Sequence, residues 1–273
     1  MTMAAKACVG VAGLWAIHSL GGAVPLAMGP KAGAGFDFSE DDADAPMGVP
    51  VAMVGDVAVV GVRGALTYGD SWFGGTNTVR LRGALRGLAG DSTVAGVVLD
   101  IDSPGGMVAG LGELMDDVEG LRAVKPVVGY VGNLGASAAY ELSSQVEELV
   151  IHRTGQVGSI GTFAVVVDDA EFFANRGIKF HVLRTGPFKG IGIDKVTPEQ
   201  LAEVQRQVDD AQREFVRLVM AGRKMTPEQV AKVADGRVWT GQEAVALGLA
   251  DRLGRLDDAV GRARELGRER KAR

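Results

Sequence analysis

The sequence predicts an α/β fold with a mainly parallel sheet and a helical C-terminal part. Continuous apolar runs, such as residues 94–101, are typical of strands buried on both faces of a parallel sheet. Segments with apolar residues at helical spacing, such as 107–122, alternate with these runs. Strands alternating with helices are typical of α/β proteins, and three helix-start signals after residue 196 predict the helical last third.

The opening segment predicts a hairpin. Two β-branched runs, 51–54 and 57–62, flank Gly55-Asp56, a dipeptide that favours a tight two-residue turn. A helix over 79–88 follows. Residues 95–131 then predict a right-handed βαβ unit, because two apolar runs enclose a helical stripe.

Three more strands and a helix are expected before residue 190. Gly177 should end the helix, because glycine readily takes the left-handed conformation that follows a helix. The strands are expected at 148–152, 163–167 and 180–184, and the helix at 169–176.

The C-terminal helices have well-marked starts. Thr197 is followed by Pro198 and, three residues after the threonine, by Gln200, which predicts a capping box on a helix that ends at Gly222. Thr226 and Thr240 begin two further helices by the same pattern, and the second of these ends at Gly248.

Composition excludes several classes of function. A chain of 273 residues, 47% of them hydrophobic, can bury a sizeable core. The net charge of −5 argues against nucleic acid as a partner. Cys8 is the only cysteine, so no internal disulfide can form, and the three histidines are too far apart in sequence to resemble a metal motif. We therefore expect no metal and no cofactor.

The N-terminus allows two interpretations. Residues 7–29 are mostly apolar and follow Lys6, as in a signal peptide or membrane anchor, but His18, Ser19 and several glycines weaken that pattern. A leader packed on the domain is the favoured interpretation. The expected organisation is a leader and acidic linker over 1–48, a folded domain over 49–260 and a basic tail over 261–273.

Ser137 is the candidate nucleophile. It lies in the small-residue run Gly135-Ala136-Ser137-Ala138-Ala139-Tyr140, where a hydroxyl has room to meet a substrate carbonyl. Upstream, Asp102-Ser103-Pro104-Gly105-Gly106 predicts a turn directly after an apolar strand. Glycines in such a turn can present backbone N–H groups to an oxyanion.

The residues leave the general base open. A serine hydroxyl needs a base within hydrogen-bond reach, and His152 and His181 are candidates without an obvious carboxylate nearby in sequence. Lys189 is the alternative, because glycines and apolar residues surround it and desolvation lowers the pKa of a lysine. Lys179 and Lys195 compete with it.

Four motifs in order resemble peptidase family S49, the signal peptide peptidase A family and its phage relatives, over residues 50–260. They are Asp102–Gly106, Gly135–Tyr140, Val157-Gly158-Ser159-Ile160-Gly161 and Thr185-Gly186-Pro187-Phe188-Lys189. The resemblance implies a ClpP/crotonase-like fold, with repeated ββα-type units around the sheet.

The resemblance also implies roles for individual residues. Ser137 would be the acylating nucleophile and Lys189 its general base, with Ser159 orienting the lysine. The backbone N–H groups of Gly106 and Ala138 would form the oxyanion hole.

The implied function is a serine endopeptidase with a Ser/Lys dyad that hydrolyses peptides or unfolded proteins, of the prophage type, cytoplasmic and homo-oligomeric. Alternatives are a signal peptide peptidase associated with the membrane through residues 7–29 and a catalytically silent assembly subunit. Trp72 and Phe73 would lie at an interface, in a substrate groove or in the core.

Overall fold

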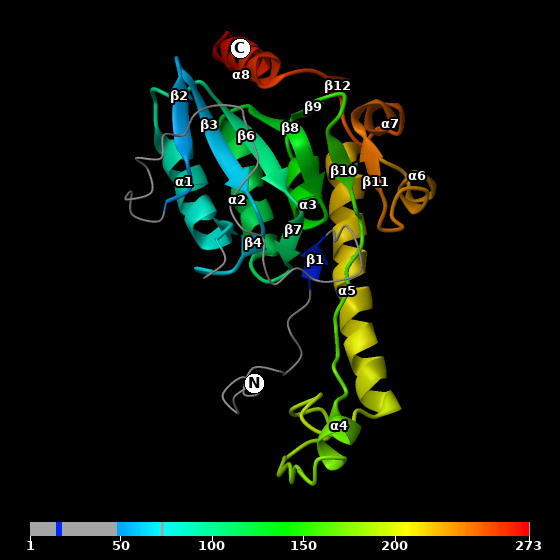
Figure 1. The fold of residues 1–273 in the computed structure, drawn as a ribbon. Helices are drawn as coiled ribbons and strands as arrows, with labels where there is room; N and C mark the ends of the chain where they lie inside the picture. The colour runs from blue at the N-terminus through cyan, green and yellow to red at the C-terminus, as the bar shows by residue number, and fades with distance from the viewer. Residues whose placement is uncertain (1–14, 18–47, 72–73, 273) are drawn as a thin grey trace.

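The computed structural model describes residues 15–17, 48–71 and 74–272 (Figure 1). Three strands pair in parallel at the centre of the larger sheet: β3 (Val57–Arg63), β6 (Gly96–Ser103) and β8 (Val127–Ala136). β2 (Val51–Val54) forms the predicted hairpin with β3 at one edge. The sheet is therefore mainly parallel, and the predicted α/β fold is confirmed.

On the side of the sheet away from β2, β8 pairs with two different strands. One stretch of β8 pairs in parallel with β9 (Glu148–Ile151), and the stretch nearer its C-terminal end pairs in parallel with β10 (Gln156–Gly158). Two late strands complete it: β11 (Val238–Thr240) beside β10 and β12 (Arg252–Leu253) beside β9. The end of β8 thus lies between β6 and β10.

A second, smaller sheet lies against the first. Its order is β1-β7-β4-β5. The strands are β1 (Trp15–Ile17), β4 (Leu66–Thr67), β5 (Thr76–Asn77) and β7 (Gly105–Met107). β6 and β7 are joined through Pro104 alone, so the small sheet is attached directly to the centre of the large one.

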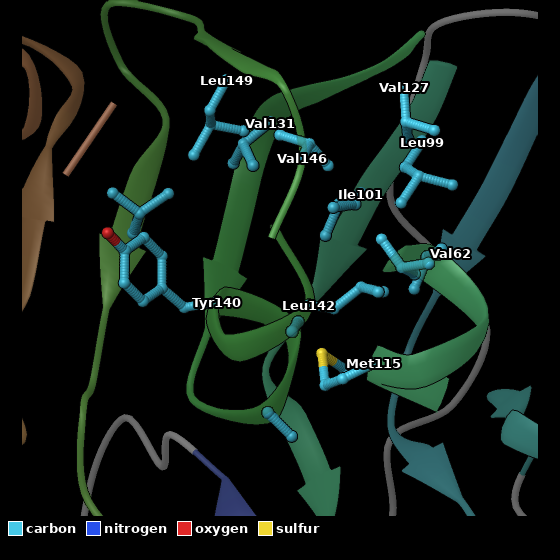
Figure 2. Close-up of a cluster of buried hydrophobic side chains, with 14 of the residues drawn as sticks. Val62, Leu99, Ile101, Met115, Val127, Val131, Tyr140, Leu142, Val146 and Leu149 are labelled. Atoms are coloured by element: carbon cyan, nitrogen blue, oxygen red, sulfur yellow. The ribbon is translucent and has the colours of Figure 1, made fainter. Parts of the chain in front are cut away.

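Helices cover both faces of the large sheet (Figure 1). α1 (Thr78–Gly90), α2 (Leu111–Val124) and α3 (Ala138–Ser144) share one hydrophobic cluster with Leu99 and Ile101 of β6. α8 (Leu256–Lys271) packs on the opposite face, where its Ala263 joins Val98 in a second cluster. β6 is thus buried on both faces, as its continuous apolar run predicts. Figure 2 shows Met115 of α2 near Leu142 of α3, with Ile101 of β6 above them and Leu99 of β6 beside Val127 of β8.

The predicted helical C-terminal part is confirmed. α5 (Pro198–Arg223) and α6 (Pro227–Ala231) both begin with complete capping boxes, and α7 (Gly241–Ala246) follows Thr240. The stretch 261–273, expected to be a basic tail, forms the second half of α8 up to Lys271. Its arginines pair with carboxylates of the body, as in the contact of Arg264 with Asp56.

Residues 162–197 form an arm that leaves β10, runs beside α5 and carries α4 (Ala170–Ala174) at the far end of that helix from the sheet (Figure 1). The predicted strands at 163–167 and 180–184 are wrong, since only an isolated bridge at Phe163 interrupts irregular chain there. Among the described residues no strand runs beside either segment, and Leu183 is 97% exposed. Apolar residues in these segments therefore face solvent in the single chain.

No helix in the described part of the chain combines the length and the apolar character needed to cross a membrane. Of the segment 7–29, only 15–17 lies within the described residues, as β1. Trp72 and Phe73 lie outside them.

Candidate active site

Ser137 lies at the elbow between β8 and α3. Its backbone has φ 56° and ψ −124°, a conformation that costs a non-glycine residue about 1–3 kcal/mol. Two hydrogen bonds hold it: the Ser137 N–H donates to the Gly158 carbonyl at 2.7 Å, and the Glu141 N–H donates to the Ser137 carbonyl at 2.8 Å. The strained turn is thus held between a sheet and a helix.

The Ser137 hydroxyl is buried and has no hydrogen-bond partner among the described residues. Leaving a buried polar group unpaired costs about 1–3 kcal/mol, so structural serines are usually paired. Every residue of α3 is buried as well, and the first N–H groups of a helix have no partner within it. An unpaired hydroxyl at this position can attack a substrate carbonyl, and the neighbouring Ala138 N–H can donate to the oxyanion that the attack forms.

The glycine turn stands beside this elbow. Gly105 has φ 98°, which favours glycine, and its N–H donates to the Ser103 hydroxyl oxygen at 3.2 Å. A Cβ on Gly106 would lie 2.0 Å from the Leu66 carbonyl oxygen, so only glycine fits where β7 passes β4. β7 therefore begins with two glycines, of which Gly105 has a positive φ and Gly106 lies too close to β4 for a side chain.

Strand pairing brings Ser137, the glycine turn and Ser159 together. Ser103 of β6 pairs with Gly135 of β8, two residues before Ser137. On the other side Gly158 of β10 pairs with Ala136, so Ser159 follows directly beside Ser137. Ser159 is buried, with φ 50°, and its N–H donates to the Arg237 carbonyl at 2.6 Å.

Lys189 is not part of this cluster within one chain. It lies exposed on the arm, in the turn closed by its own N–H donating to the Gly186 carbonyl at 3.2 Å. The side chain of Gln200 ties this turn to the start of α5 by donating to the Pro187 carbonyl at 2.6 Å. α5 has 26 residues, about 39 Å at the rise of a helix. Its other end packs on α3, where the Gln145 side chain donates to the Leu218 carbonyl.

The competing bases do not reach Ser137 either. His152 follows β9, and its N–H donates to the Val131 carbonyl. From Val131 to Ser137 β8 covers on the order of 20 Å. His181, Lys179 and Lys195 all lie exposed on the arm.

Glu141 is a feature of the site that the sequence interpretation missed. Its side chain is buried four residues after Ser137, and burial raises its pKa from 4.5 to about 8, with Glu214 adding to the rise and Arg217 opposing it. The only signal in the sequence is a charged residue inside the otherwise small and apolar run 138–142. Tyr140 packs in the core beside the elbow (Figure 2), and its hydroxyl donates to the Leu249 carbonyl at 3.0 Å.

Comparison with known proteins gives the family. The model described as peptidase family S49 matches residues 119–269, a stretch that contains Ser137, Ser159 and Lys189. Protease 4 of Salmonella typhi is 33% identical over 227 residues, which is 82% of this chain and 37% of that protein. The chain belongs to peptidase family S49.

Other relatives come from phages. Capsid assembly protease C of Escherichia phage lambda is 29% identical, over 83% of this chain and 51% of that protein. Head-tail preconnector protein GP5 of Enterobacteria phage P21 is 31% identical, over 76% of this chain and 42% of that protein. The chain thus spans about a third to a half of the length of these relatives. A solved member of the enoyl-CoA hydratase/isomerase family matches at 15% identity with a TM-score of 0.47, over 82% of this chain and 77% of that one.

Proposed function

We propose that this chain is a serine endopeptidase in which Ser137 forms an acyl-enzyme and Lys189 serves as general base. The observation that carries the proposal is the buried Ser137 hydroxyl, which is unpartnered among the described residues and held on a strained elbow beside a glycine turn. Strain and an unpaired hydroxyl both cost stability, so their retention at one residue favours a chemical role.

The proposed reaction uses backbone and side-chain groups alone. The Ser137 hydroxyl attacks the scissile carbonyl while the lysine amine takes its proton. The N–H groups of Gly106 and Ala138 stabilise the oxyanion. The lysine then protonates the leaving amine, and water releases the acyl group by the same route. Ser159, which follows β10 and lies beside Ser137, orients the lysine ammonium.

The lysine comes from a second copy of the chain in this proposal. Lys189 is exposed on an arm beyond the sheet, whereas Ser137 lies inside the body of the same protein. Exposed apolar side chains cluster on the same arm, as expected for a surface that another copy covers. They include Val165, Val167, Phe172, Phe188 and Leu183. A homo-oligomer then buries the arm and brings the base to the nucleophile.

Substrates are peptides or unfolded proteins, and we place the chain with the prophage-type branch. The Ala138-Ala139 pair after the nucleophile supports this, as does the similarity to phage lambda capsid assembly protease C over 83% of the chain. Cleavage of signal peptides is the alternative substrate choice. An unfolded protein and a signal peptide offered in parallel distinguish the two.

Mixing two inactive variants tests the dyad and its assembly. Ser137→Ala and Lys189→Ala should each abolish cleavage of an unfolded protein, as followed by mass spectrometry of new termini. After joint refolding, the mixture should regain up to about a quarter of the wild-type rate, because random association pairs an intact serine with an intact lysine in that share of sites. Lys195→Ala is the control and should cleave at the wild-type rate.

Three results would contradict this account. A Lys189→Ala protein as active as wild type would remove Lys189 as the base. A mixture without activity would exclude a dyad shared between copies. Absence of cleavage by wild type would favour the catalytically silent subunit.

A further inference from the structure

Strand β7 has two edges, and the chain's own N-terminal segment covers one of them. β4 pairs with β7 in parallel, with Leu66 opposite Gly106. β1 pairs with the other edge in antiparallel register, with Trp15 opposite Met107, Ala16 opposite Gly106 and Ile17 opposite Gly105. Among the described strands, β1 is the one that covers this edge. Without it, the backbone groups of the glycine strand would be open to another peptide.

The register places this pairing at the candidate active site. Gly135 pairs with Ser103, so Ser137 and Gly105 each lie two residues beyond the same point of the sheet. α3, which begins directly after Ser137, also contacts β7. Ile17, opposite Gly105, is therefore the residue of β1 that pairs nearest to the glycine turn.

The direction of β1 also fits a substrate. A peptide that adds to a sheet edge binds through main-chain hydrogen bonds and needs an unobstructed strand beside it. Gly105 and Gly106 carry no side chains that could obstruct it. Because β1 runs antiparallel to β7, its chain proceeds from Met107 toward the glycine turn and the nucleophile. A substrate strand bound this way would present its next peptide bond to Ser137.

We propose that the edge of β7 is a peptide-binding edge which residues 15–17 of the same chain occupy, so that the leader competes with peptide substrates for the active site. That the competing peptide is a substrate rests on the proposed function. The pairing itself is independent of catalysis. Release of β1 then precedes substrate binding, and the leader acts as an intramolecular inhibitor.

A binding experiment tests this without activity. In full-length Ser137→Ala protein, Ala16→Pro should displace β1, because proline removes a strand N–H and fixes φ. The probe is a fluorescent peptide with the sequence of residues 12–20. The double variant should bind it at least about tenfold more tightly than the single variant, because a tethered competitor acts at an effective concentration near millimolar. Ala23→Pro, outside β1, is the matched control and should leave the affinity unchanged.

Hydrogen exchange gives a second readout. Because alternate residues of an antiparallel strand bond to one neighbour, a protein with proline at both positions 16 and 17 loses the N–H that faces β7 whichever of the two donates it. At least one of the Gly106 and Met107 amides should exchange faster in that protein than in the Ala23→Pro protein. Equal peptide affinity or equal exchange in the two proteins would overturn the proposal. If wild type cleaves no peptide, the proposed function fails, but the affinity of the Ser137→Ala proteins still decides whether β1 occupies the edge.

Discussion

Glu141→Gln should remove a large pH dependence from the stability of this protein. Burial against α5 raises the pKa of the Glu141 carboxyl from 4.5 to about 8, so the folded state holds a proton that the unfolded state releases. A raised pKa contributes stability that is complete below pH 4.5 and is lost as the pH rises through 8. At 1.36 kcal/mol per pKa unit, the loss is about 5 kcal/mol at its upper limit.

Denaturant unfolding at fixed protein concentration, from pH 4 to pH 9, measures this loss. Wild type and Glu141→Gln should have nearly equal free energies of unfolding below pH 5, because glutamine resembles the neutral carboxyl. Above pH 8 the variant should be more stable by several kcal/mol. Glu119→Gln, on the exposed side of α2, is the control and should follow the wild-type curve. If the Glu141→Gln curve ran parallel to the wild-type curve, the buried acid would not be protonated and the reasoning would be refuted.

Two substitutions test the glycine strand and the core. Gly106→Ala should lower kcat for peptide cleavage by at least about a hundredfold, because its Cβ would meet the Leu66 carbonyl and shift the proposed oxyanion donor. Gly112→Ala, a position with open space around it, is the control and should leave kcat unchanged. Equal rates for the two variants would remove Gly106 from the site. Leu85→Ala on α1 should cost about 2–5 kcal/mol in denaturant unfolding, because the side chain is fully buried, whereas Val79→Ala, 46% exposed on the same helix, should cost far less. Similar losses at the two positions would contradict the assigned packing of α1.

Local patterns in the sequence predicted the helices and central strands of the large sheet. The helices satisfy their own backbone hydrogen bonds, and the central strands lie between other long strands. The capping boxes at Thr197 and Thr226 depend on residues three apart, so the chain itself specifies them. The apolar run of β6 forms a strand because β3 and β8 flank it. The roles assigned to Ser137, Lys189, Ser159, Gly106 and Ala138 came from motif resemblance and stay predictions.

The arm shows where such patterns mislead. Residues 163–167 and 180–184 have strand-like composition, but a strand forms only where a second strand accepts its backbone bonds. The burial of Glu141 was equally invisible, because it depends on α5, which lies some sixty residues later along the chain. The pairing of Trp15–Ile17 with Gly105–Met107 joins segments too short and too far apart for any periodicity to indicate.

The site divides into a part fixed by the sheet and a part carried on the arm. Ser137, Gly106 and Ser159 are positioned by paired strands and by hydrogen bonds inside the body, so their geometry does not depend on the arm. Lys189 depends on the arm alone, through a turn tied to Gln200. A nucleophile without a base is a weak one. Under the two proposals made above, an isolated chain would carry Ser137 in place but without its base, and both the arrival of Lys189 from a second copy and the departure of β1 would act on a serine that the sheet already positions.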